Sequence, residues 1–532
     1  MEFVSAIFLI FVSIVCVIYF AFPKKHRWVV LLIASYLFYW FNSTYLAAVL
    51  AGMTVVTWLT GLMIEKTSDK ASEYFKEHQA QMTESERKSY KNSVTQKKKR
   101  ILLLGVLIDL GVLLFFKYHN FFLGNAASLL GLFGIPMKDY RFDLLLPLGI
   151  SFYTLQAIAY MVDIYRKKYR ADRRFFRFAL FMSYFPQIVQ GPIARYHKLA
   201  EQIYQEHSFD FTRLKFGCQL ILWGFMKKLI LADRLGILVD TIFDNYTDYR
   251  GGILFLGAIG FGLQTYADFS GGMEIARGVS QIFGIELEIN FKQPYFAKSI
   301  EEFWRRWHIT LGTWMKDYIF YPLSLSKRFA NLSKKARKLF GNYIGKKLPS
   351  FLAMFLVYFL VGFWHGSSWK YVVYGIWNGM IITSGILLAP VYQKGIALFH
   401  VKEDSYGWKF FQMVRTFLLC SLGRFFSRAG SCMIAFSMIR NMFLYPRTWE
   451  FFDGTLLTLG LDAKDLTVLA AMIILLLLVD IAHERGVKIR ESIASQGFIF
   501  RWLIYWTAFY LVVIFGMYGP AYDSSSFIYQ QF

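Results

Sequence analysis

Long apolar stretches separated by short polar ones run through the whole chain. Crossing a bilayer takes about 20 mostly apolar residues, and many stretches approach that length. Several are too short to cross, so the pattern predicts about 11 full crossings, with the other segments re-entrant or tilted. We therefore expect an all-α polytopic membrane protein. The candidate membrane segments are residues 3–22, 28–41, 45–64, 101–117, 120–134, 144–164, 174–192, 213–232, 252–267, 271–284, 351–365, 369–391, 410–426, 431–446, 464–482 and 499–518.

Three basic stretches between the apolar segments orient the chain. Residues 65–100 carry 10 Lys and Arg against 6 Asp and Glu. Residues 166–177 carry seven basic residues and one acidic residue, and residues 327–347 carry eight basic residues and no acidic one. Because Lys and Arg are enriched in cytoplasmic loops, we place all three in the cytoplasm, with 65–100 as a polar loop. The alternative is that each binds a partner.

Composition supports one membrane-embedded domain over residues 1–532. Hydrophobic residues make up 56% of the chain and charged residues only 18%, against about 25% charged in soluble domains. The net charge of +23 would ordinarily suggest nucleic-acid binding. Here the basic residues cluster between apolar segments, so the charge follows membrane topology and nucleic acid is excluded as a partner. The four cysteines form no CxxC or CxH pair, so no metal site is predicted.

The stretch from Gln264 to Lys316 differs from the rest of the chain. It mixes glycine, charged and aromatic residues at membrane-like hydrophobicity. Backbone of this kind is tolerated at membrane depth only where it is buried in protein or lines a watery cavity. We therefore expect the catalytic core within residues 264–380.

His365 is the first candidate for chemistry. It ends the apolar run Phe351–Trp364, and a second apolar segment follows directly. An ionisable residue within a membrane segment is costly, and this favours a functional role. The alternative is a core histidine hydrogen-bonded to a carbonyl.

His308 is the second candidate. Trp304, Trp307, Leu311, Trp314 and Met315 lie on one face at helical spacing, with Arg305, Arg306 and Lys316 elsewhere. The pattern predicts a continuous amphipathic helix at the membrane surface or beneath the bundle. The alternative is an interfacial helix whose histidine is incidental.

Carboxylates inside apolar segments are a further signal. Asp268 stands beside the pair Gly271-Gly272, where it could cap a broken helix or line a cavity. Asp480 closes an apolar run and is expected to be structural. Asp109 interrupts another run and is expected to pair with a basic side chain of a neighbouring helix, with a proton relay as the alternative.

Histidine suits one reaction in particular. Acyl transfer from a thioester to a hydroxyl needs a base near neutral pH to take the hydroxyl proton. Charge developing on the carbonyl oxygen needs donors, which Trp indole N–H groups or backbone amides can supply. No Gly-x-Ser-x-Gly elbow or cysteine-based triad is evident, so direct transfer is preferred to a covalent acyl-enzyme.

Several motifs together resemble the bacterial membrane-bound O-acyltransferases. The segment Gly362–Gly366 (GFWHG) matches the histidine motif of that family, and Phe303–Leu311 (FWRRWHITL) resembles its second signature. The tail Ser526–Phe532 resembles the branch that acetylates alginate. The resemblance covers nearly the whole chain. Further matching stretches are Phe185–Ile193, Leu222–Lys228, Tyr266–Gly271 and Asp317–Ile319.

The resemblance implies a fold and a set of roles. Tilted helices would ring a thin central region, with a cytoplasmic and an extracellular funnel meeting near the catalytic histidine. His365 would be the catalytic base or its close equivalent, and His308 the second family histidine, placed on the cytoplasmic side along the donor path. The residues expected along the substrate tunnel are Trp304, Trp307, Arg306, Trp364, Asp268 and Ser270.

The resemblance also implies the reaction. An acyl group would pass from a cytoplasmic thioester, such as acetyl-CoA or an acyl carrier protein, to the outer face of the bacterial plasma membrane. No cofactor is expected to stay bound. The acceptor would be a hydroxyl of a cell-surface polysaccharide or an extracellular partner protein. Acetyl is the group in the alginate, cellulose and peptidoglycan branches, and D-alanyl in the teichoic acid branch.

Two features depart from the alginate-type pattern, and two rival functions remain. Residues Gly271–Ala276 differ from the usual sequence after the Tyr266–Gly271 motif, and the 65–100 stretch is larger than expected. A transporter would show paired halves with corresponding broken helices, which the sequence lacks. A non-enzymatic scaffold of a polymer-export complex would leave the tryptophan and histidine cluster unexplained.

Overall fold

The computed structural model describes residues 3–42, 44–135, 142, 144–518 and 527. Within these ranges nearly all regular structure is helical, no β-strand is present, and one isolated antiparallel bridge joins Phe291 to Trp307. The predicted all-α class is confirmed. The chain divides into two compact units, residues 1–214 with 279–288 and residues 215–278 with 289–532.

The first unit is built around helix α5 (Ile150–Tyr165), which is buried along almost its whole length. It packs against α3 and α4, and this explains why apolar residues occur on all its sides. The other helices of this unit are α1 (Ala6–Ala21), η1 (Lys24–His26), α2 (Arg27–Asn42), α3 (Thr44–His78), α4 (Glu84–Leu132), α6 (Phe175–Ser183), α7 (Phe185–Ile188) and α8 (Tyr196–Tyr204).

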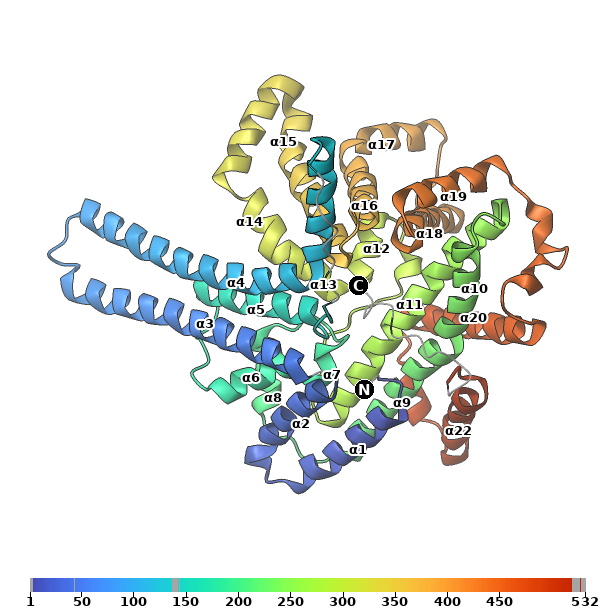
Figure 1. Ribbon diagram of the computed structural model, residues 1–532, viewed down its shortest axis with the longest axis horizontal. Coiled ribbons are helices and arrows are strands. Elements are labelled where there is room, and N and C mark those ends of the chain that lie inside the picture. Colours follow the sequence, from blue (N-terminus) through green and yellow to red (C-terminus); the bar gives the residue numbers. More distant parts are fainter. Residues whose placement is uncertain (1–2, 43, 136–141, 143, 519–526, 528–532) are drawn as a thin grey trace. The chain divides into compact units, whose positions relative to one another are not determined.

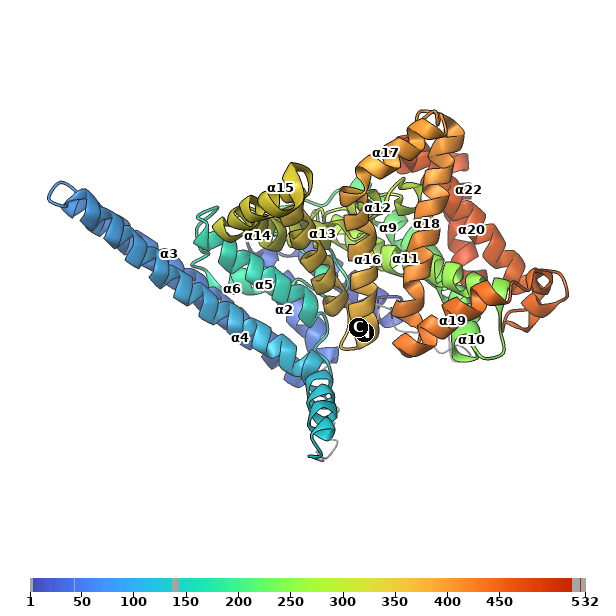
Figure 2. The same cartoon turned by 90° about the horizontal axis from the view of Figure 1, so that it is seen from above.

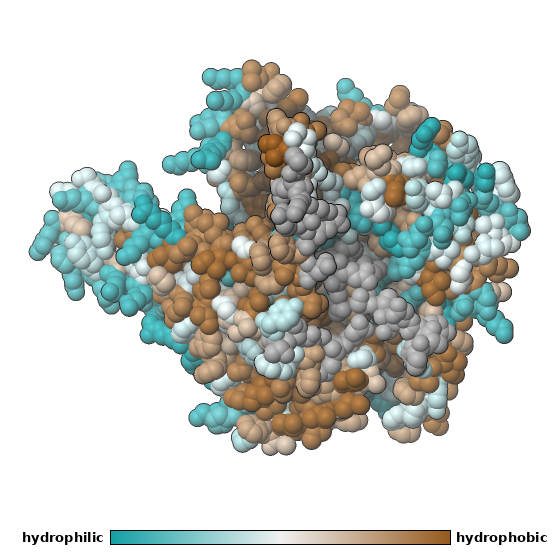
Figure 3. Space-filling model, in the orientation of Figure 1, coloured by the Kyte–Doolittle hydropathy of each residue, from teal (hydrophilic) through white to brown (hydrophobic). Residues whose placement is uncertain are grey.

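The stretch predicted as a polar loop, residues 65–100, is a helical hairpin. Helices α3 and α4 run side by side and their hydrophilic ends project beyond the other helices of the unit (Figures 1, 2 and 3). Thr83 begins α4 through a capping box in which its hydroxyl accepts from the Glu86 N–H and the Glu86 carboxylate accepts from the Thr83 N–H. Good helix formers such as Lys and Glu, with this cap, continue both helices past their apolar parts.

Among the residues that the structure describes, no ion pair joins Asp109 to a basic side chain. It is fully buried in α4, and its carboxylate accepts a hydrogen bond of 2.9 Å from the Thr57 hydroxyl of α3. That expectation was wrong because the neighbouring helix presents a hydroxyl at this level. Thr57 thus ties the apolar part of α3 to that of α4.

The second unit holds the rest of the helices. Helix α15 contains a break at Gly341, whose φ of 81° is in the left-handed region, and the Ser333 hydroxyl reaches back to the Gly345 carbonyl across that break. The helices are α9 (Phe211–Phe225), the π-helix η2 (Met226–Ala232), α10 (Asp233–Asp244), α11 (Gly251–Ile282), η3 (Pro294–Phe296), α12 (Ile300–Arg306), α13 (Ile309–Met315), the π-helix η4 (Lys316–Phe320), α14 (Tyr321–Ser324), α15 (Lys327–His365), α16 (Trp369–Leu387), α17 (Ala389–Leu398), α18 (Tyr406–Arg428), α19 (Cys432–Leu444), η5 (Thr448–Phe451), η6 (Thr455–Thr458), α20 (Ala463–Glu484), α21 (Ile489–Ala494) and α22 (Phe498–Phe515); the ends of α9 and α11 extend into the first unit.

Helix α11 is continuous where a break was predicted at Gly271. A Cβ on Gly271 would lie 2.9 Å from the Gly224 carbonyl oxygen, and one on Gly278 would lie 2.6 Å from that of Gly217. The glycines are seven residues apart on both α9 and α11, so they form one face on each helix. They serve close helix packing, as small residues do in membranes, and so the helix does not end there.

Six helices are long and apolar enough to cross a membrane, or seven if the bent pair α16 and α17 forms one span. The six are α3 from Tyr45, α4, α11, α15, α20 and α22. Helices α1 and α19 are apolar but shorter. Among the described residues the structure thus supports a multi-pass membrane protein, while the count of about 11 crossings stays a prediction.

Candidate active site

His308 lies at a break between α12 and α13, not within one continuous helix. The Trp307 N–H closes α12 on the Phe303 carbonyl, and Trp307 itself is extended. His308 then takes φ 47° and ψ 52°, the left-handed region that non-glycine residues rarely adopt. The predicted amphipathic helix is therefore two short helices with the histidine at the turn between them.

A short antiparallel pairing holds this turn. The Lys292 N–H donates to the Arg306 carbonyl at 2.9 Å, and the Ile309 N–H donates to the Asn290 carbonyl at 3.0 Å. The Asn290 side chain reinforces the pairing, since its Oδ1 accepts from the Thr310 N–H at 2.8 Å. These contacts offset the cost of the unusual backbone at His308, about 1–3 kcal/mol for such a residue.

The imidazole of His308 is enclosed by polar and aromatic groups. It is 1% exposed, and its Nδ1 lies 3.2 Å from Asn290 Nδ2. Its ring centroid is 4.9 Å from that of Phe269 and 5.8 Å from that of Trp364. Burial, and next the neighbouring His365, lower the pKa of His308 well below its usual range, so the ring is neutral near pH 7.

His365 ends α15 immediately before the turn into α16. The two helices approach closely at glycines, because a Cβ on Gly362 would lie 2.4 Å from the Tyr371 carbonyl oxygen and one on Gly375 2.5 Å from that of Tyr358. His365 is 7% exposed. Its ring centroid lies 5.1 Å from that of Trp364, so both histidines contact the same indole.

A cavity of about 430 Å³ opens beside His308. Its walls come from α12, α13, η4 and α15 and are mostly apolar, with Met354 and Tyr358 on the α15 side. Trp304 also lines it, and so do the cationic side chains of Arg305 and Lys316. Glu301 lines the cavity as well and pairs with Arg305 at 3.4 Å. The cavity therefore combines an apolar wall, a net positive charge and an imidazole, which suits a long ligand with an anionic end.

Two of the tryptophans predicted for the tunnel do not line this cavity. Trp307 stacks on Phe303 with ring centroids 5.4 Å apart, and Trp364 lies against the two histidines. Trp304 does line the cavity, and its indole N–H donates to Asn378 at 3.3 Å. Trp304 and His308 thus line the cavity, whereas Trp307 and Trp364 belong to the aromatic packing behind its wall.

Asp268 and Ser270 also lie away from the cavity wall. Asp268 accepts from Lys228 at 2.7 Å, and the Ser270 hydroxyl accepts from Lys227 at 2.9 Å. Both lysines belong to the π-helix η2 and are buried. Asp268 lies inside the continuous helix α11 and is not among the residues that line this cavity; together with Asp233 it pairs with the buried Lys228.

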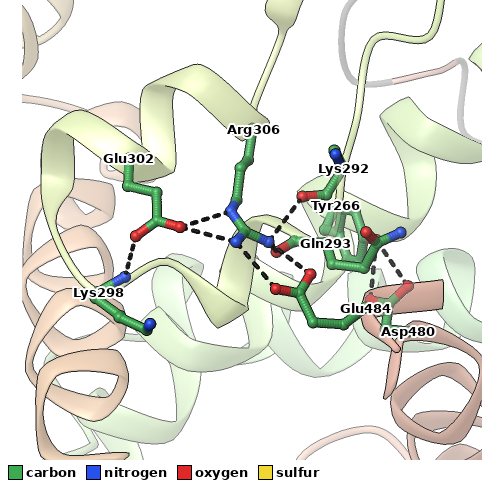
Figure 4. A network of polar contacts seen from close by, with 8 residues as sticks. All are labelled: Tyr266, Lys292, Gln293, Lys298, Glu302, Arg306, Asp480 and Glu484. Carbon is green, nitrogen blue, oxygen red and sulfur yellow. Dashed lines mark hydrogen bonds and ion pairs between the residues drawn. The ribbon is translucent and has the colours of Figure 1, made fainter. Parts of the chain in front are cut away.

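Arg306 is held in a network of ion pairs shown in Figure 4. Its guanidinium donates to Glu484 of α20 through both Nη atoms, at 2.7 and 3.0 Å, and to Glu302 at 2.8 and 3.0 Å. It also reaches the carbonyls of Lys292 and Gln293. Arg306 therefore ties α20 and the 292–293 strand-like segment to the end of α12, and it does not line the cavity.

The same network includes Asp480. Its carboxylate accepts from the Tyr266 hydroxyl at 2.9 Å, one turn of α20 before Glu484 (Figure 4). The expectation that Asp480 is structural agrees with this contact, which joins α20 to α11.

Sequence reasoning did not single out Asn290 or Glu484. Asn290 lies between Ile289 and Phe291, inside the stretch expected to hold the site, and its polar side chain among apolar neighbours was the available signal. Glu484 is the last residue of the apolar helix α20, and a charged residue at the end of such a helix gives no signal of a distant partner. Its partner lies 178 residues earlier in the chain, a distance that no local pattern reveals.

Comparison with known proteins identifies the family of the chain. Residues 166–341 match the MBOAT, membrane-bound O-acyltransferase family. The chain is 33% identical to the probable alginate O-acetylase of Pseudomonas aeruginosa over 85% of its own length and 76% of that protein.

Two further relatives are a peptidoglycan O-acetyltransferase and a teichoic acid D-alanyltransferase. The peptidoglycan O-acetyltransferase of Helicobacter pylori is 28% identical over 79% of this chain and 74% of its own. The teichoic acid D-alanyltransferase of Streptococcus thermophilus is 30% identical over 44% of this chain and 55% of its own. The chain belongs to the membrane-bound O-acyltransferase family and is an acyltransferase.

Proposed function

We propose that this protein moves an acetyl group from a cytoplasmic thioester across the plasma membrane of a bacterium toward hydroxyls of a cell-surface polysaccharide, directly or through a partner protein. The observation that carries the proposal is the pair of buried histidines against Trp364, one of them lining an apolar cavity. Acetyl is favoured over D-alanyl because the O-acetylating relatives match far more of the chain.

The cavity suits the proposed donor. A thioester carrier such as acetyl-CoA or an acyl carrier protein ends in a long pantetheine arm with a phosphate at its far end. The apolar wall near Met354 would hold the arm, and Lys316 would attract the phosphate, while Arg305 shares its charge with Glu301. The thioester would then lie near His308. The other residues expected along the tunnel would support this wall from behind: Trp307, Trp364, Arg306, Asp268 and Ser270.

His365 is the proposed base. It takes the proton of the acceptor hydroxyl as the oxygen attacks the thioester carbonyl carbon. The C–S bond then breaks, and the imidazolium of His365 returns the proton to the departing thiolate. The ester and the free thiol are the products, and no covalent acyl-enzyme is needed.

Surface ester content tests this function. A strain that lacks the gene would be complemented with the wild type, with His365→Ala, or with His26→Ala as a control at an exposed histidine. Equal amounts of each protein in the membrane are required. We expect the ester to be lost with His365→Ala and kept with His26→Ala, and the released acid to be acetic acid. Unchanged ester with His365→Ala would show that this histidine is structural, and release of D-alanine would move the protein to the teichoic acid branch.

A further inference from the structure

The side-chain amide of Asn290 has one orientation that satisfies all its neighbours. It is 2% exposed. Its Oδ1 is 2.8 Å from the Thr310 N and 3.0 Å from the Thr310 Oγ1. Its Nδ2 is 3.2 Å from His308 Nδ1 and 3.6 Å from the Met273 sulfur. The amide oxygen thus faces the two polar groups of Thr310, and the amide nitrogen faces His308 and Met273.

The reverse orientation fails on chemistry. A backbone N–H such as that of Thr310 can only donate, so it needs an oxygen opposite it. With the amide reversed, the oxygen could still accept from an Nδ1–H of His308, but the NH₂ group would face the Thr310 N–H, and two donors would then oppose each other at 2.8 Å. A buried group without a partner costs about 1–3 kcal/mol. The Thr310 N–H therefore assigns Oδ1 to its own side and Nδ2 to the side of His308.

This assignment decides where the proton of His308 lies. Since Asn290 Nδ2 can only donate, the Nδ1 of His308 must accept. A neutral imidazole has one N–H and one bare nitrogen, so the hydrogen is on Nε2. The ring is neutral because burial lowers the pKa of His308 well below its usual range.

We propose that Asn290 is a positioning residue that holds His308 as its Nε2–H tautomer, so that His308 acts as a hydrogen-bond donor and cannot act as the base. This inference rests on the proposed acyl transfer for its chemical meaning. His308 lines the cavity, and its Nε2–H would donate to the thioester carbonyl oxygen as negative charge develops there. His365 is then the base of the pair.

The reaction divides accordingly between the two histidines. The acceptor O–H bond breaks toward His365, the new C–O bond forms, and the C–S bond breaks. His308 donates throughout to the carbonyl oxygen and loses no proton. Removing one donor of this kind typically lowers turnover about 100-fold to 1000-fold.

Nitrogen-15 NMR tests the tautomer directly. The sample is the full-length protein in lipid bilayers with histidine labelled by ¹³C and ¹⁵N, and the His308 signals are those that disappear in His308→Gln. We expect a protonated Nε2 and a bare Nδ1 in the wild type. A protonated Nδ1 would overturn the proposal. This readout does not depend on activity, so it separates failure of the tautomer from failure of the proposed function.

The variant Asn290→Leu tests the role of the amide. It removes the donor to Nδ1 at nearly constant volume, so we expect a mixture of both tautomers. With acetyl-CoA as the probe, we expect kcat for thiol release to fall in proportion to the fraction of His308 that loses the Nε2–H tautomer, about twofold for an equal mixture, while the KM for acetyl-CoA changes little. Asn331→Leu, at an exposed asparagine of α15, is the matched control and should change neither.

The outcomes are distinct. A pure Nε2–H signal in Asn290→Leu would show that another group sets the tautomer and would overturn the role of Asn290. If Asn290→Leu does not fold, the wild-type spectrum still decides the tautomer. A wild type with the Nε2–H tautomer but no acyl transfer would contradict the proposed function and leave the tautomer assignment intact.

Discussion

The two histidines of the site are held in different ways. His308 lies in a left-handed turn that is held by hydrogen bonds from Asn290 and by the ion pairs of Arg306 with Glu484, which lies 178 residues further along the chain. His365 ends a helix that is fixed by close backbone contact at Gly362 and Gly375. Polar contacts set the orientation and tautomer of a side chain, whereas backbone contact sets only its place. The difference fits the proposed roles. His308, the hydrogen-bond donor, must point its Nε2–H at the thioester carbonyl oxygen, whereas His365, the base, must lie near the acceptor hydroxyl.

The largest effect is expected from Gly362→Ala. The new Cβ would meet the backbone carbonyl of Tyr371 at 2.4 Å, and a backbone oxygen cannot move aside without shifting α16. Overpacking of this kind costs about 1–3 kcal/mol, and it displaces His365. We expect a lower melting temperature and loss of ester formation. Gly385→Ala, on α16 with nothing within 4 Å of its Cβ, is the control; equal behaviour of the two variants would contradict the packing role.

A smaller effect is expected from Glu484→Gln. The substitution leaves Arg306 with Glu302 but removes one charge of the network in Figure 4. We expect transfer to fall by about 3-fold to 10-fold, and a double-mutant cycle with Arg306→Gln to give a coupling of about 0.5–3 kcal/mol. Asp404→Asn, in the exposed pair with Lys409, should leave activity unchanged. Additive effects at Arg306 and Glu484 would show that the ion pair between them does not contribute to transfer.

Lys316→Ala should act on donor binding alone. If Lys316 attracts the donor phosphate, its loss raises the KM for the thioester by a few-fold and leaves kcat unchanged. The increase should shrink at high salt because a partly exposed charge pair is screened. A fall in kcat without a change in KM would place Lys316 in the chemical step instead.

The smallest effect is a pH dependence of stability. Burial lowers the folded-state pKa of His308 well below the ordinary value of 6.5, so below pH 6.5 the unfolded chain binds a proton that the folded protein does not. Stability is therefore lost as pH falls. Between pH 7.5 and 5.5 the wild type should lose about 1 kcal/mol more than His308→Gln, measured by thermal unfolding in detergent. Equal losses would contradict a neutral buried His308.

The helical class was predicted from the sequence and is confirmed, and the sequence also singled out the two histidines that the structure brings against the same indole. Apolar length reveals membrane helices, and a histidine such as His365 at the end of an apolar run stands out because burying it is costly. The family resemblance added the reaction. These features depend on local composition, which a sequence displays directly.

The rest depended on partners far apart in the chain. Gly271 was expected to break a helix because the opposing glycines of α9 cannot be seen from α11 alone. Arg306 and Asp268 were expected along the substrate tunnel from the family resemblance, and nothing in the sequence indicated that they pair with Glu484 and Lys228. The turn at His308 was expected to be helical because its apolar spacing is helical, and only the Asn290 contacts explain the break.

The most direct test makes the same substitution at both histidines. Glutamine can donate a hydrogen bond from its amide but cannot take a proton at neutral pH. In the complemented deletion strain, His365→Gln should abolish surface ester, since a general base contributes about 100-fold to 10,000-fold. His308→Gln should keep ester formation within about tenfold of the wild type, because one donor is replaced by another. Equal loss in both variants, or activity in His365→Gln, would contradict the division of roles between the two histidines.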